Sequence, residues 1–506
     1  MIRTVLKLFF LVAALMTALP ALAQSIRLKA VTVSPSDYLL EEDVEAVTAR
    51  YVGRDVTFPD LQAMLSALNR LYARAGVPTA RAVLPPQEIR NGVLRVSLIE
   101  AEIEKVVFDG LENTSPRFLE SNLSLEPGTK PDFERLERDL MIFDIAHDIS
   151  PQLSFAAGGL PGTTQAIVTA DEPKRLVFTL SADNFGREET GELRTSLFAR
   201  ANSLSGVRDT LSLQLQKSEG AGSVSAGYSR PVGGGGGRVV GAFSYSQSSI
   251  IGGEFQNSKI VSDSYAASLS YRRPAWVRPD SYVMLEGGAS YEVNSSTFDG
   301  VTFADIDLWD VFASARYNRR FANSTLGFSA GLRAGSASAK GTSQTEGSFW
   351  MIYGEGTYAR PIGERFMFNG NLRYQYAHGR NLPVARLFTA GGVGSVRGYP
   401  SDIRGGDSGA ILNLQVSMRE PWSPASRPDW NFTPFAFVDT AMVVPYRVDG
   451  SIDGSQDFLA SVGAGVSASL GERANLIAMV GIPLRETLGF NQEGRGVIHV
   501  GLDFNF

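Results

Sequence analysis

Two short stretches of the chain match motifs that carry chemistry in enzymes. Gly327–Gly331 reads GFSAG, the G-x-S-x-G pattern of hydrolases with a serine nucleophile. That pattern requires a sharp strand-to-helix turn, whereas here Phe328 and Ala330 alternate with Ser329 as they would in mid-strand. The five glycines from Gly233 lack the Lys-Ser/Thr pair of a phosphate-binding loop and are typical of a hairpin turn. With three histidines in the whole chain, we expect no catalytic site, no metal and no cofactor.

A third stretch contains an arginine that could form an ion pair. Leu387–Gly406, LFTAGGVGSVRGYPSDIRGG, is too long and too rich in glycine for a simple hairpin loop. It contains the run Val396, Arg397, Gly398 and Tyr399. An arginine in such a loop can be exposed to solvent. If the loop enters an enclosed lumen instead, the guanidinium needs a carboxylate that accepts two hydrogen bonds, because an unpaired charge there is costly.

The C-terminal part of the chain, which contains this loop, is built almost entirely of alternating segments. Runs of about ten residues, such as the one with Leu176, Phe178 and Leu180, alternate apolar with polar or small side chains between turn residues. We count about 16 such strands, an even number as in single-chain bacterial barrels. The alternative, a soluble β-sandwich, rarely uses so long a chain. The pattern predicts a membrane all-β fold, an antiparallel transmembrane β-barrel of about 16 strands over residues 173–506.

The final ten residues, VIHVGLDFNF, show the alternation most clearly. Every second residue is apolar and the residues between them are small or polar. Because one face of a barrel strand meets lipid, we expect the apolar set to point outward: Ile498, Val500, Leu502, Phe504 and Phe506. An open sheet edge is not stable in hydrocarbon, so this strand must also pair with the first barrel strand.

Residues 24–172 contain helical and strand patterns in two copies. In the first copy, residues 24–103, a helix opens at Pro59 and carries an apolar stripe that we interpret as core. In the second copy, residues 104–172, a helix opens at Pro131 with the matching stripe, which makes the copies an internal repeat. Each copy is therefore predicted to be a small α+β module. The other predicted helices are Glu41–Tyr51 and Ser115–Leu123, and the predicted strands are Ile26–Val33, Ala80–Leu84, Val93–Ile99, Val106–Phe108, Gln152–Ala156 and Gln165–Thr169.

The N-terminus is typical of an exported protein. Arg3 and Lys7 precede the apolar stretch Leu8–Ala18, and Ala21–Ala23 forms a small-x-small cleavage site. Residues 1–23 are therefore predicted to be a secretory signal peptide. A retained membrane anchor is the alternative, but the apolar stretch is short for one.

The composition agrees with an exported barrel. The chain has no cysteine, so a large core or a closed sheet must provide stability without disulfides. The net charge of -6 gives no basic surface for nucleic acid. The 52 glycines and 10% aromatic residues suit an outer-membrane β-barrel.

Three stretches resemble a known family. Ser395–Tyr399, SVRGY, resembles the loop signature of the POTRA–barrel superfamily of outer-membrane assembly and secretion proteins. Tyr51–Gln87, YVGRDVTFPDLQAMLSALNRLYARAGVPTARAVLPPQ, is similar to the first POTRA module of the two-partner secretion branch, the haemolysin and adhesin activators called TpsB proteins. Asp183–Arg194, DNFGREETGELR, is similar to the first barrel hairpin of that branch. Two POTRA-like repeats, rather than five, also favour it.

This resemblance implies a partner for the loop arginine. In the family the loop folds back into the barrel, and its arginine pairs with an aspartate in a Phe-x-Asp motif on the inner wall. Phe437-Val438-Asp439, in the predicted strand Thr433–Val443, fits that motif, while Ala441 stands where the family often has glycine. The resemblance thus implies that Arg397 of the pore-loop motif faces an inner-wall partner formed by Phe437 and Asp439.

The resemblance also implies a location and a function. We expect the barrel to lie in the lipid of the bacterial outer membrane and the POTRA modules to lie in the periplasm. The modules would capture an unfolded partner exoprotein of the adhesin or haemolysin type by strand addition, and the barrel pore would secrete it. Phe504 and Phe506 look like the signal recognised by the barrel-assembly machinery. No nucleic acid is expected as a partner.

Two other functions stay open at this point. A barrel-assembly factor shares the loop signature but usually has more POTRA modules, and a passive porin has none. Many TpsB proteins begin with a helix that plugs the barrel. Cleavage after Ala23 would leave only Gln24 and Ser25 before the first predicted strand, too few for a helix. We therefore expect the loop Leu387–Gly406 alone to occupy the pore.

Overall fold

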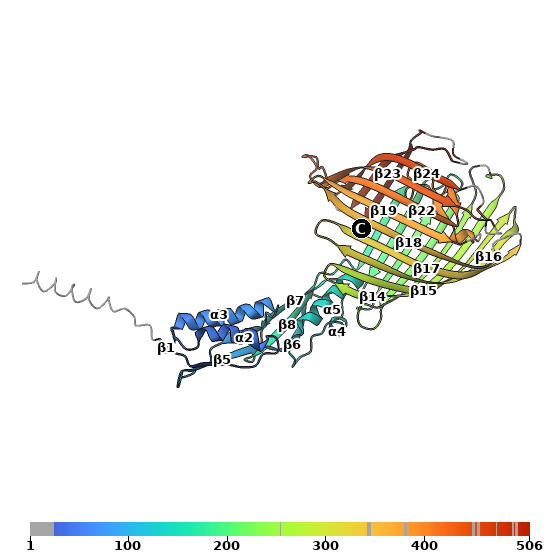
Figure 1. Ribbon diagram of the computed structural model, residues 1–506. Coiled ribbons are helices and arrows are strands. Elements are labelled where there is room, and N and C mark those ends of the chain that lie inside the picture. The colour runs from blue at the N-terminus through green and yellow to red at the C-terminus, as the bar shows by residue number, and fades with distance from the viewer. Residues whose placement is uncertain are drawn as a thin grey trace, which may run out of the picture. The chain divides into compact units, whose positions relative to one another are not determined.

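Sixteen strands close into one barrel in the computed structural model (Figure 1). The structure describes residues 25–253, 255–341, 346–378, 382–447, 451–452, 456–471, 473–487, 490 and 494–506, so the predicted signal peptide lies outside the described residues. Neighbouring strands are antiparallel, and the last strand pairs with the first through partners such as Gly501 and Asp183. The prediction of an antiparallel barrel of about 16 strands is confirmed. The strands are β9 (Leu176–Asp183), β10 (Arg194–Asn202), β11 (Thr210–Lys217), β12 (Ala221–Pro231), β13 (Arg238–Ser249), β14 (Ile260–Arg278), β15 (Ser281–Phe298), β16 (Val301–Arg320), β17 (Thr325–Gly341), β18 (Gly347–Ile362), β19 (Phe366–Ala377), β22 (Ser408–Met418), β23 (Trp430–Val444), β24 (Asp457–Leu470), β25 (Ala474–Pro483) and β26 (Val497–Asn505).

The outer face of the barrel accounts for the alternation in the sequence. On β26, Ile498, Val500 and Phe504 are exposed on the outside, while His499 between them is buried. Apolar side chains exposed in this periodic way are stable against lipid rather than water. Gly233–Gly237 forms the turn between β12 and β13, as predicted.

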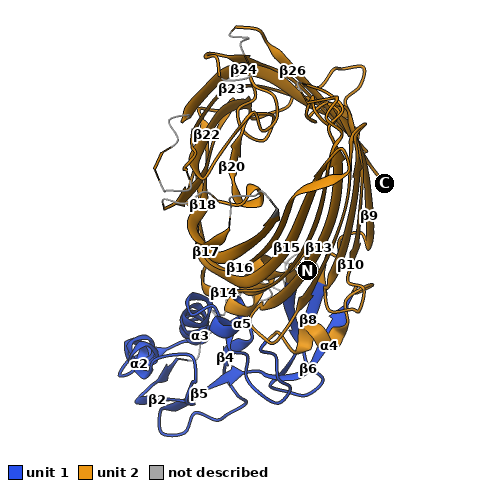
Figure 2. Cartoon of the chain, turned by 90° about the vertical axis from the view of Figure 1, so that its right-hand side faces the viewer, with its two compact units in different colours: residues 1–109, 124–137, 152–169 blue, residues 110–123, 138–151, 170–506 orange. Residues whose placement is uncertain are grey.

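The chain divides into two compact units (Figure 2). One holds residues 1–109, 124–137 and 152–169, and the other holds residues 110–123, 138–151 and 170–506. The division passes through the second predicted module, so the module boundaries given by the sequence stay a prediction. The elements of that module are β6 (Glu102–Asp109), α4 (Pro116–Glu120), α5 (Phe133–Ala146), β7 (Pro151–Ala157) and β8 (Thr163–Ala170). No helix within the described residues is long and apolar enough to cross a membrane.

The first module forms its core around helix α3. Thr57 and Asp60 cap the start of this helix reciprocally, and Gly76 follows its end with φ +70°. The helix buries Leu61, Met64 and Leu68 against the sheet, so its stripe is core, as interpreted from the sequence. The elements are β1 (Ile26–Arg27), β2 (Ala30–Val33), α2 (Glu41–Thr48), η1 (Ala49–Tyr51), β3 (Asp55–Val56), α3 (Phe58–Arg74), β4 (Ala80–Val83) and β5 (Val93–Glu100).

One predicted strand of this module is in fact two. β1 pairs with β3, whereas β2 runs parallel to β5 in the sheet β2–β5–β4. The chain changes partner at Leu28, which is fully buried and whose N–H donates to the carbonyl oxygen of Arg54 at 3.1 Å. The next N–H, that of Lys29, donates to the carbonyl oxygen of Gly92 at 2.8 Å. The apolar positions shift by one residue, from Ile26, Leu28 and Ala30 to Val31 and Val33. This change of phase close to the break was the signal that the prediction of one strand missed.

Candidate functional site

The segment between β19 and β22 folds inside the ring of barrel strands, where Figure 2 shows its strand β20. It contains η2 (Val384–Arg386) and the short antiparallel pair β20 (Phe388–Ala390) and β21 (Arg404–Gly406). We call residues 382–407 the pore loop. Gly391 and Gly392 have φ of +117° and +81°, and a Cβ on Gly391 would lie 2.3 Å from the carbonyl oxygen of Pro400. The glycines therefore permit the tight fold of the loop tip.

Arg397 meets Asp439 of β23 through both side chains. Nε donates to Oδ2 and Nη2 donates to Oδ1, both at 2.8 Å, and the backbone N–H of Arg397 donates to Oδ2 at 3.1 Å. The third guanidinium nitrogen donates to Oε1 of Gln415 at 2.8 Å, and the guanidinium carbon lies 3.5 Å from the ring centre of Phe437. Asp439 is fully buried and the Arg397 side chain is 10% exposed. A buried carboxylate with both oxygens satisfied by one guanidinium is a strong and directional contact, and we call it the Arg397 anchor.

The residues beside Arg397 press the loop against the barrel wall. Gly398 donates its N–H to Oγ of Ser461 at 3.2 Å, and a Cβ at this position would lie 2.6 Å from the Ser461 Cβ. Any larger residue there would move the loop off the wall. Tyr399 is fully buried, and its hydroxyl lies 2.8 Å from the carbonyl oxygen of Arg485. Val396 and Tyr399 share an apolar cluster with Ala441, so a methyl group fits where the family often has glycine.

A second arginine ties the base of the pore loop to a different part of the wall. Arg386 Nε and Nη2 donate to Oδ2 of Asp310 on β16 at 2.9 and 2.7 Å. Its Nη1 donates to Oε2 of Glu292 on β15 at 2.8 Å. Arg333 of β17 donates to the other oxygen of Asp310, which is fully buried. We call this group of side chains the Arg386 anchor.

The sequence analysis missed the Arg386 anchor. The only available signal was a carboxylate at an inward position in the middle of a long strand, because Asp310 lies in register with Ser290 and Gly335. An ionised group in such a place is expected to have a partner. The partner itself lies 76 residues away in an irregular segment, and no spacing rule connects the two.

Two family models match the chain. The family described as haemolysin secretion/activation protein ShlB/FhaC/HecB matches residues 162–468, more than half of the chain, and the ShlB-type POTRA domain matches residues 26–101. The chain belongs to the haemolysin secretion/activation family. As a member of this family it is an outer-membrane β-barrel with its POTRA domain in the periplasm. The recognition of a TpsB-type sequence is confirmed.

Individual relatives are similar over different shares of the chain. The heme/hemopexin transporter protein HuxB of Haemophilus influenzae (strain 86-028NP) is 25% identical over 186 residues, which are 36% of this chain and 33% of that protein. The chain thus aligns with about a third of the length of that relative. The outer membrane transporter CdiB of Dickeya dadantii (strain 3937) is 24% identical over 448 residues, 84% of this chain and 77% of that protein. Among solved structures, CdiB from Escherichia coli has a TM-score of 0.72 at 18% identity, covering 97% of this chain and 92% of that chain, and shows the same fold.

The last strand of this family member carries the predicted assembly signal. Phe504 and Phe506 are 41% and 65% exposed, and the N–H of Phe506 donates to the carbonyl oxygen of Phe178 on β9 at 3.0 Å. The terminal residues thus lie at the closing seam of the barrel. Their role as a recognition signal stays a prediction. Ser329 of the GFSAG stretch lies within β17, where its Oγ accepts the N–H of Glu355 at 3.1 Å.

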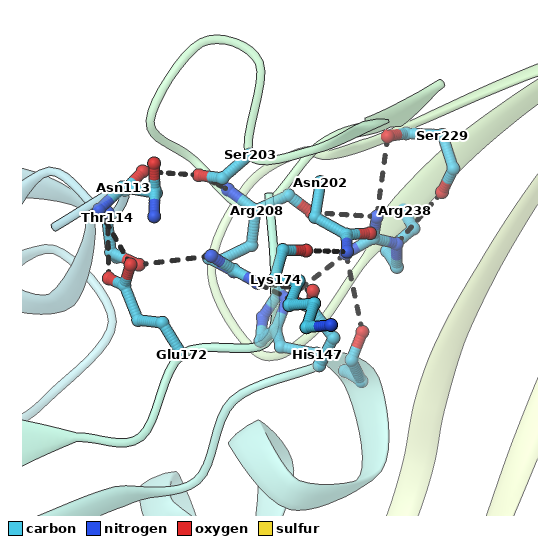
Figure 3. A network of polar contacts seen from close by, with 12 residues as sticks. Asn113, Thr114, His147, Glu172, Lys174, Asn202, Ser203, Arg208, Ser229 and Arg238 are labelled. Carbon is cyan, nitrogen blue, oxygen red and sulfur yellow. Dashed lines mark hydrogen bonds and ion pairs between the residues drawn. The ribbon is translucent and has the colours of Figure 1, made fainter. Parts of the chain in front are cut away.

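A polar network joins the turn between β10 and β11 to the chain segment that precedes the barrel, within one compact unit (Figure 3). Arg208, in the turn between β10 and β11, is fully buried and pairs through Nε with Oδ1 of Asp148 at 2.8 Å. In the same turn, the hydroxyl of Ser203 donates to the carbonyl oxygen of Asn113 at 2.6 Å. Glu172 accepts the N–H of Thr114 at 2.9 Å. These contacts fix the segment to this turn.

His147 completes this network as a neutral acceptor. Its Nδ1 lies 3.2 Å from Nη1 of Arg238, which can only donate. The ring also contacts Phe118 and Phe143. Burial, and then the positive charge of Arg238, lowers the pKa of His147 to about 4. The imidazole is therefore uncharged at neutral pH.

A second polar network lies within the other compact unit. Lys130 donates to Oε2 of Glu100 at 2.9 Å and also pairs with Asp37. The hydroxyl of Tyr72 donates to the other oxygen of Glu100 at 2.8 Å. Burial raises the pKa of Glu100, but hydrogen bonds from Ser36 and Lys130 outweigh it and hold the pKa below its ordinary value. This carboxylate ties the end of β5 to the segment before α5.

Proposed function

We propose that the protein secretes an unfolded partner exoprotein, of the adhesin or haemolysin type, from the periplasm through its barrel pore. The observation that carries the proposal is the Arg397 anchor, a loop of the family's signature held inside a closed barrel by Asp439. The ShlB-type POTRA domain supports it, as do relatives named as transporters. A passive porin has no POTRA domain, and an enzyme would need a catalytic site.

Capture would occur by strand addition on a POTRA sheet. In the sheet β6–β8–β7, β7 pairs only with β8 among the described residues. The N–H of Gly158, just after β7, donates to the carbonyl oxygen of Thr163 at 3.0 Å. Because N–H direction alternates along an antiparallel strand, the N–H of Ala157 and that of Phe155 point to the open edge. An extended segment of any sequence can pair with such an edge through main-chain hydrogen bonds.

Passage would then follow through the lumen. The sequence contains no nucleotide-binding motif, so folding of the partner outside the cell would bias its movement. The pore loop would act as the conformational element of the pore, because it occupies the lumen and is held there by side-chain contacts such as those of Arg397 and Arg386.

Two further partners are expected for a barrel of this kind. The exposed apolar outer face would contact outer-membrane lipid. The barrel-assembly machinery would recognise the final strand through Phe504 and Phe506.

Secretion by a recipient strain tests the proposal. The protein is produced together with a candidate exoprotein, a large secreted β-helical protein where a neighbouring reading frame encodes one, and the candidate is measured at the cell surface and in the medium. We expect Ala157→Pro, which removes an edge-facing N–H, to lower secretion while the barrel assembles normally. Ala157→Gly keeps that N–H and serves as the matched control.

The outcomes separate the alternatives. If the parent protein secretes nothing and its depletion instead lowers other outer-membrane barrels, the protein is an assembly factor. If Ala157→Pro secretes as well as Ala157→Gly, capture does not use the β7 edge.

A further inference from the structure

One part of the inner barrel wall carries mostly small side chains at its inward positions. Across β11 to β15, one row in register runs Ser212, Gly227, Ala242, Ser268 and Ser290. The next row runs Gln214, Ser225, Ser244 and Ala266. Their outward neighbours are large and exposed, among them Leu213, Phe243 and Leu269. We call the inward residues 212, 225, 227, 242, 244, 266 and 268 the serine wall.

Three of the four hydroxyls of this wall are available for a partner, while that of Ser212 donates to the carbonyl oxygen of Gly227 at 3.4 Å. Ser225, Ser244 and Ser268 are not buried, and their hydroxyls make no hydrogen bond to any residue that the structure describes. Ser461 on β24 provides the contrast, because it is fully buried and accepts the N–H of Gly398 from the pore loop. Ser461 thus holds the loop, as does Ser290 at the end of the first row, whose Oγ accepts from Nη2 of Arg386 at 3.3 Å. Ser225, Ser244 and Ser268 instead line a hollow.

Three hollows run between the serine wall and the pore loop. A hollow of about 460 Å³ lies along the serine wall and shares Phe312 and Arg333 with a second of about 710 Å³. The second shares Arg373 with a third, of about 570 Å³, which reaches the loop residues Val393 and Ser395. Shared lining residues make the hollows neighbours, and we call this series, which begins at the serine wall and reaches the pore loop, the lane.

The ring geometry explains why the lane lies there. The strand order places β13 and β23 the same number of strands apart in either direction around the barrel. Asp439 of the Arg397 anchor is on β23, and Ser244 is on β13. The Arg397 anchor thus holds the loop on the wall that faces the serine wall, while Arg386 and the ion pair between Asp402 and Arg187 tie it to other parts of the barrel.

We propose that the serine wall is the surface along which the exported polypeptide passes in extended form, between β11–β14 and the pore loop. This inference rests on the proposed secretion function and adds where the partner contacts the barrel. A serine hydroxyl can both donate and accept, so it can bond to the peptide N–H or C=O of any sequence. Short side chains leave width for bulky partner residues, and the serine wall itself carries no large apolar side chain to hold them.

Single cysteines test the lane, since the chain has none of its own. The variants are Ser225→Cys and Ser244→Cys, with Ala226→Cys as the matched control. Ala226 is the neighbour of Ser225 on β12 and points to the outside. Each variant is labelled with a bulky polyethylene-glycol maleimide, and the extent of labelling is measured by mass. Secretion of the candidate exoprotein is then compared before and after labelling.

We expect labelling at 225 or 244 to abolish secretion and to reduce single-channel conductance, whereas Ala226→Cys is unchanged by exposure to the reagent. A photo-crosslinker on the same cysteines should trap the exoprotein during export at 225 and 244 only. Full labelling at both wall positions with undiminished secretion would overturn the proposal. If the unlabelled variants and the parent all fail to secrete, the secretion function itself is wrong, which is a separate result.

Discussion

Two facing parts of the barrel wall have the same pattern of strand pairing but carry different inward side chains. On β22 to β24 the inward side chains are large, charged or buried, and they bond to the pore loop through Asp439, Gln415 and Ser461. On β11 to β14 the residues of the serine wall are small, and the hydroxyls of Ser225 and Ser244 have no hydrogen-bond partner among the described residues. Strand pairing is therefore satisfied equally on both walls. The choice of inward side chains alone decides which wall holds the loop and which leaves room.

Removing residues 387–406 of the pore loop should abolish the difference between the two walls and give the largest effect. Replacing Leu387–Gly406 by a short Gly-Ser link leaves the barrel ladder intact, because none of these residues belongs to a barrel strand. We expect single-channel conductance in planar bilayers to rise severalfold, since the space left by the loop would join the hollows beside it. Heat-modifiable mobility on gels checks that the barrel still closes. Conductance as low as that of the parent would mean that another segment blocks the lumen.

Breaking the Arg397 anchor should free the loop without removing it. Arg397→Ala leaves Asp439 buried without its partner, which costs roughly 3–5 kcal/mol for a buried pair. We expect Arg397→Ala and Asp439→Ala each to abolish exoprotein secretion while the barrel still assembles.

The double variant shows whether the two residues act as a pair. It should be no worse than either single variant, because the contact can be lost only once. Additive losses in thermal stability would show that the residues act separately.

Loosening the Arg386 anchor should have a smaller effect. Arg386→Gln removes a charge next to Asp310, but Arg333 still pairs with that carboxylate. The Arg397 anchor also stays intact. We expect a modest rise in conductance with more frequent transitions between levels, and secretion that is reduced rather than lost. Arg386→Lys, which keeps the charge, is the control, and an unchanged current trace in Arg386→Gln would show that the loop base needs no anchor.

The sequence predicted the barrel better than it predicted the interior. Alternation with period two follows from the geometry of any strand with one face in lipid, so the strand count and the closure by β26 could be derived. Asp439 was assigned to Arg397 by the family motif, and the two side chains lie in contact. Arg386 could not be paired, because its partners Glu292 and Asp310 lie on strands far away in sequence. The serine wall also escaped notice, since small inward residues are as compatible with a packed lumen as with an open one.

The network outside the membrane should respond to pH, and this gives the smallest effect. His147 has a pKa of about 4 in the folded protein and about 6.5 when unfolded, so the unfolded chain binds more protons between these values. The free energy of unfolding should therefore fall as pH drops below about 6.5, with the loss complete below about 4 and at most about 3 kcal/mol. Protonation would also place a positively charged donor against Arg238 and beside Arg208, and the carboxylate of Asp148 would offset only part of this repulsion.

His147→Gln keeps an acceptor but does not titrate, so its thermal midpoint should vary less between pH 7 and pH 5 than that of the parent. His378→Gln, at an exposed histidine, should vary as the parent does. Equal pH dependence in His147→Gln and the parent would show that the turn is held to its segment without this histidine.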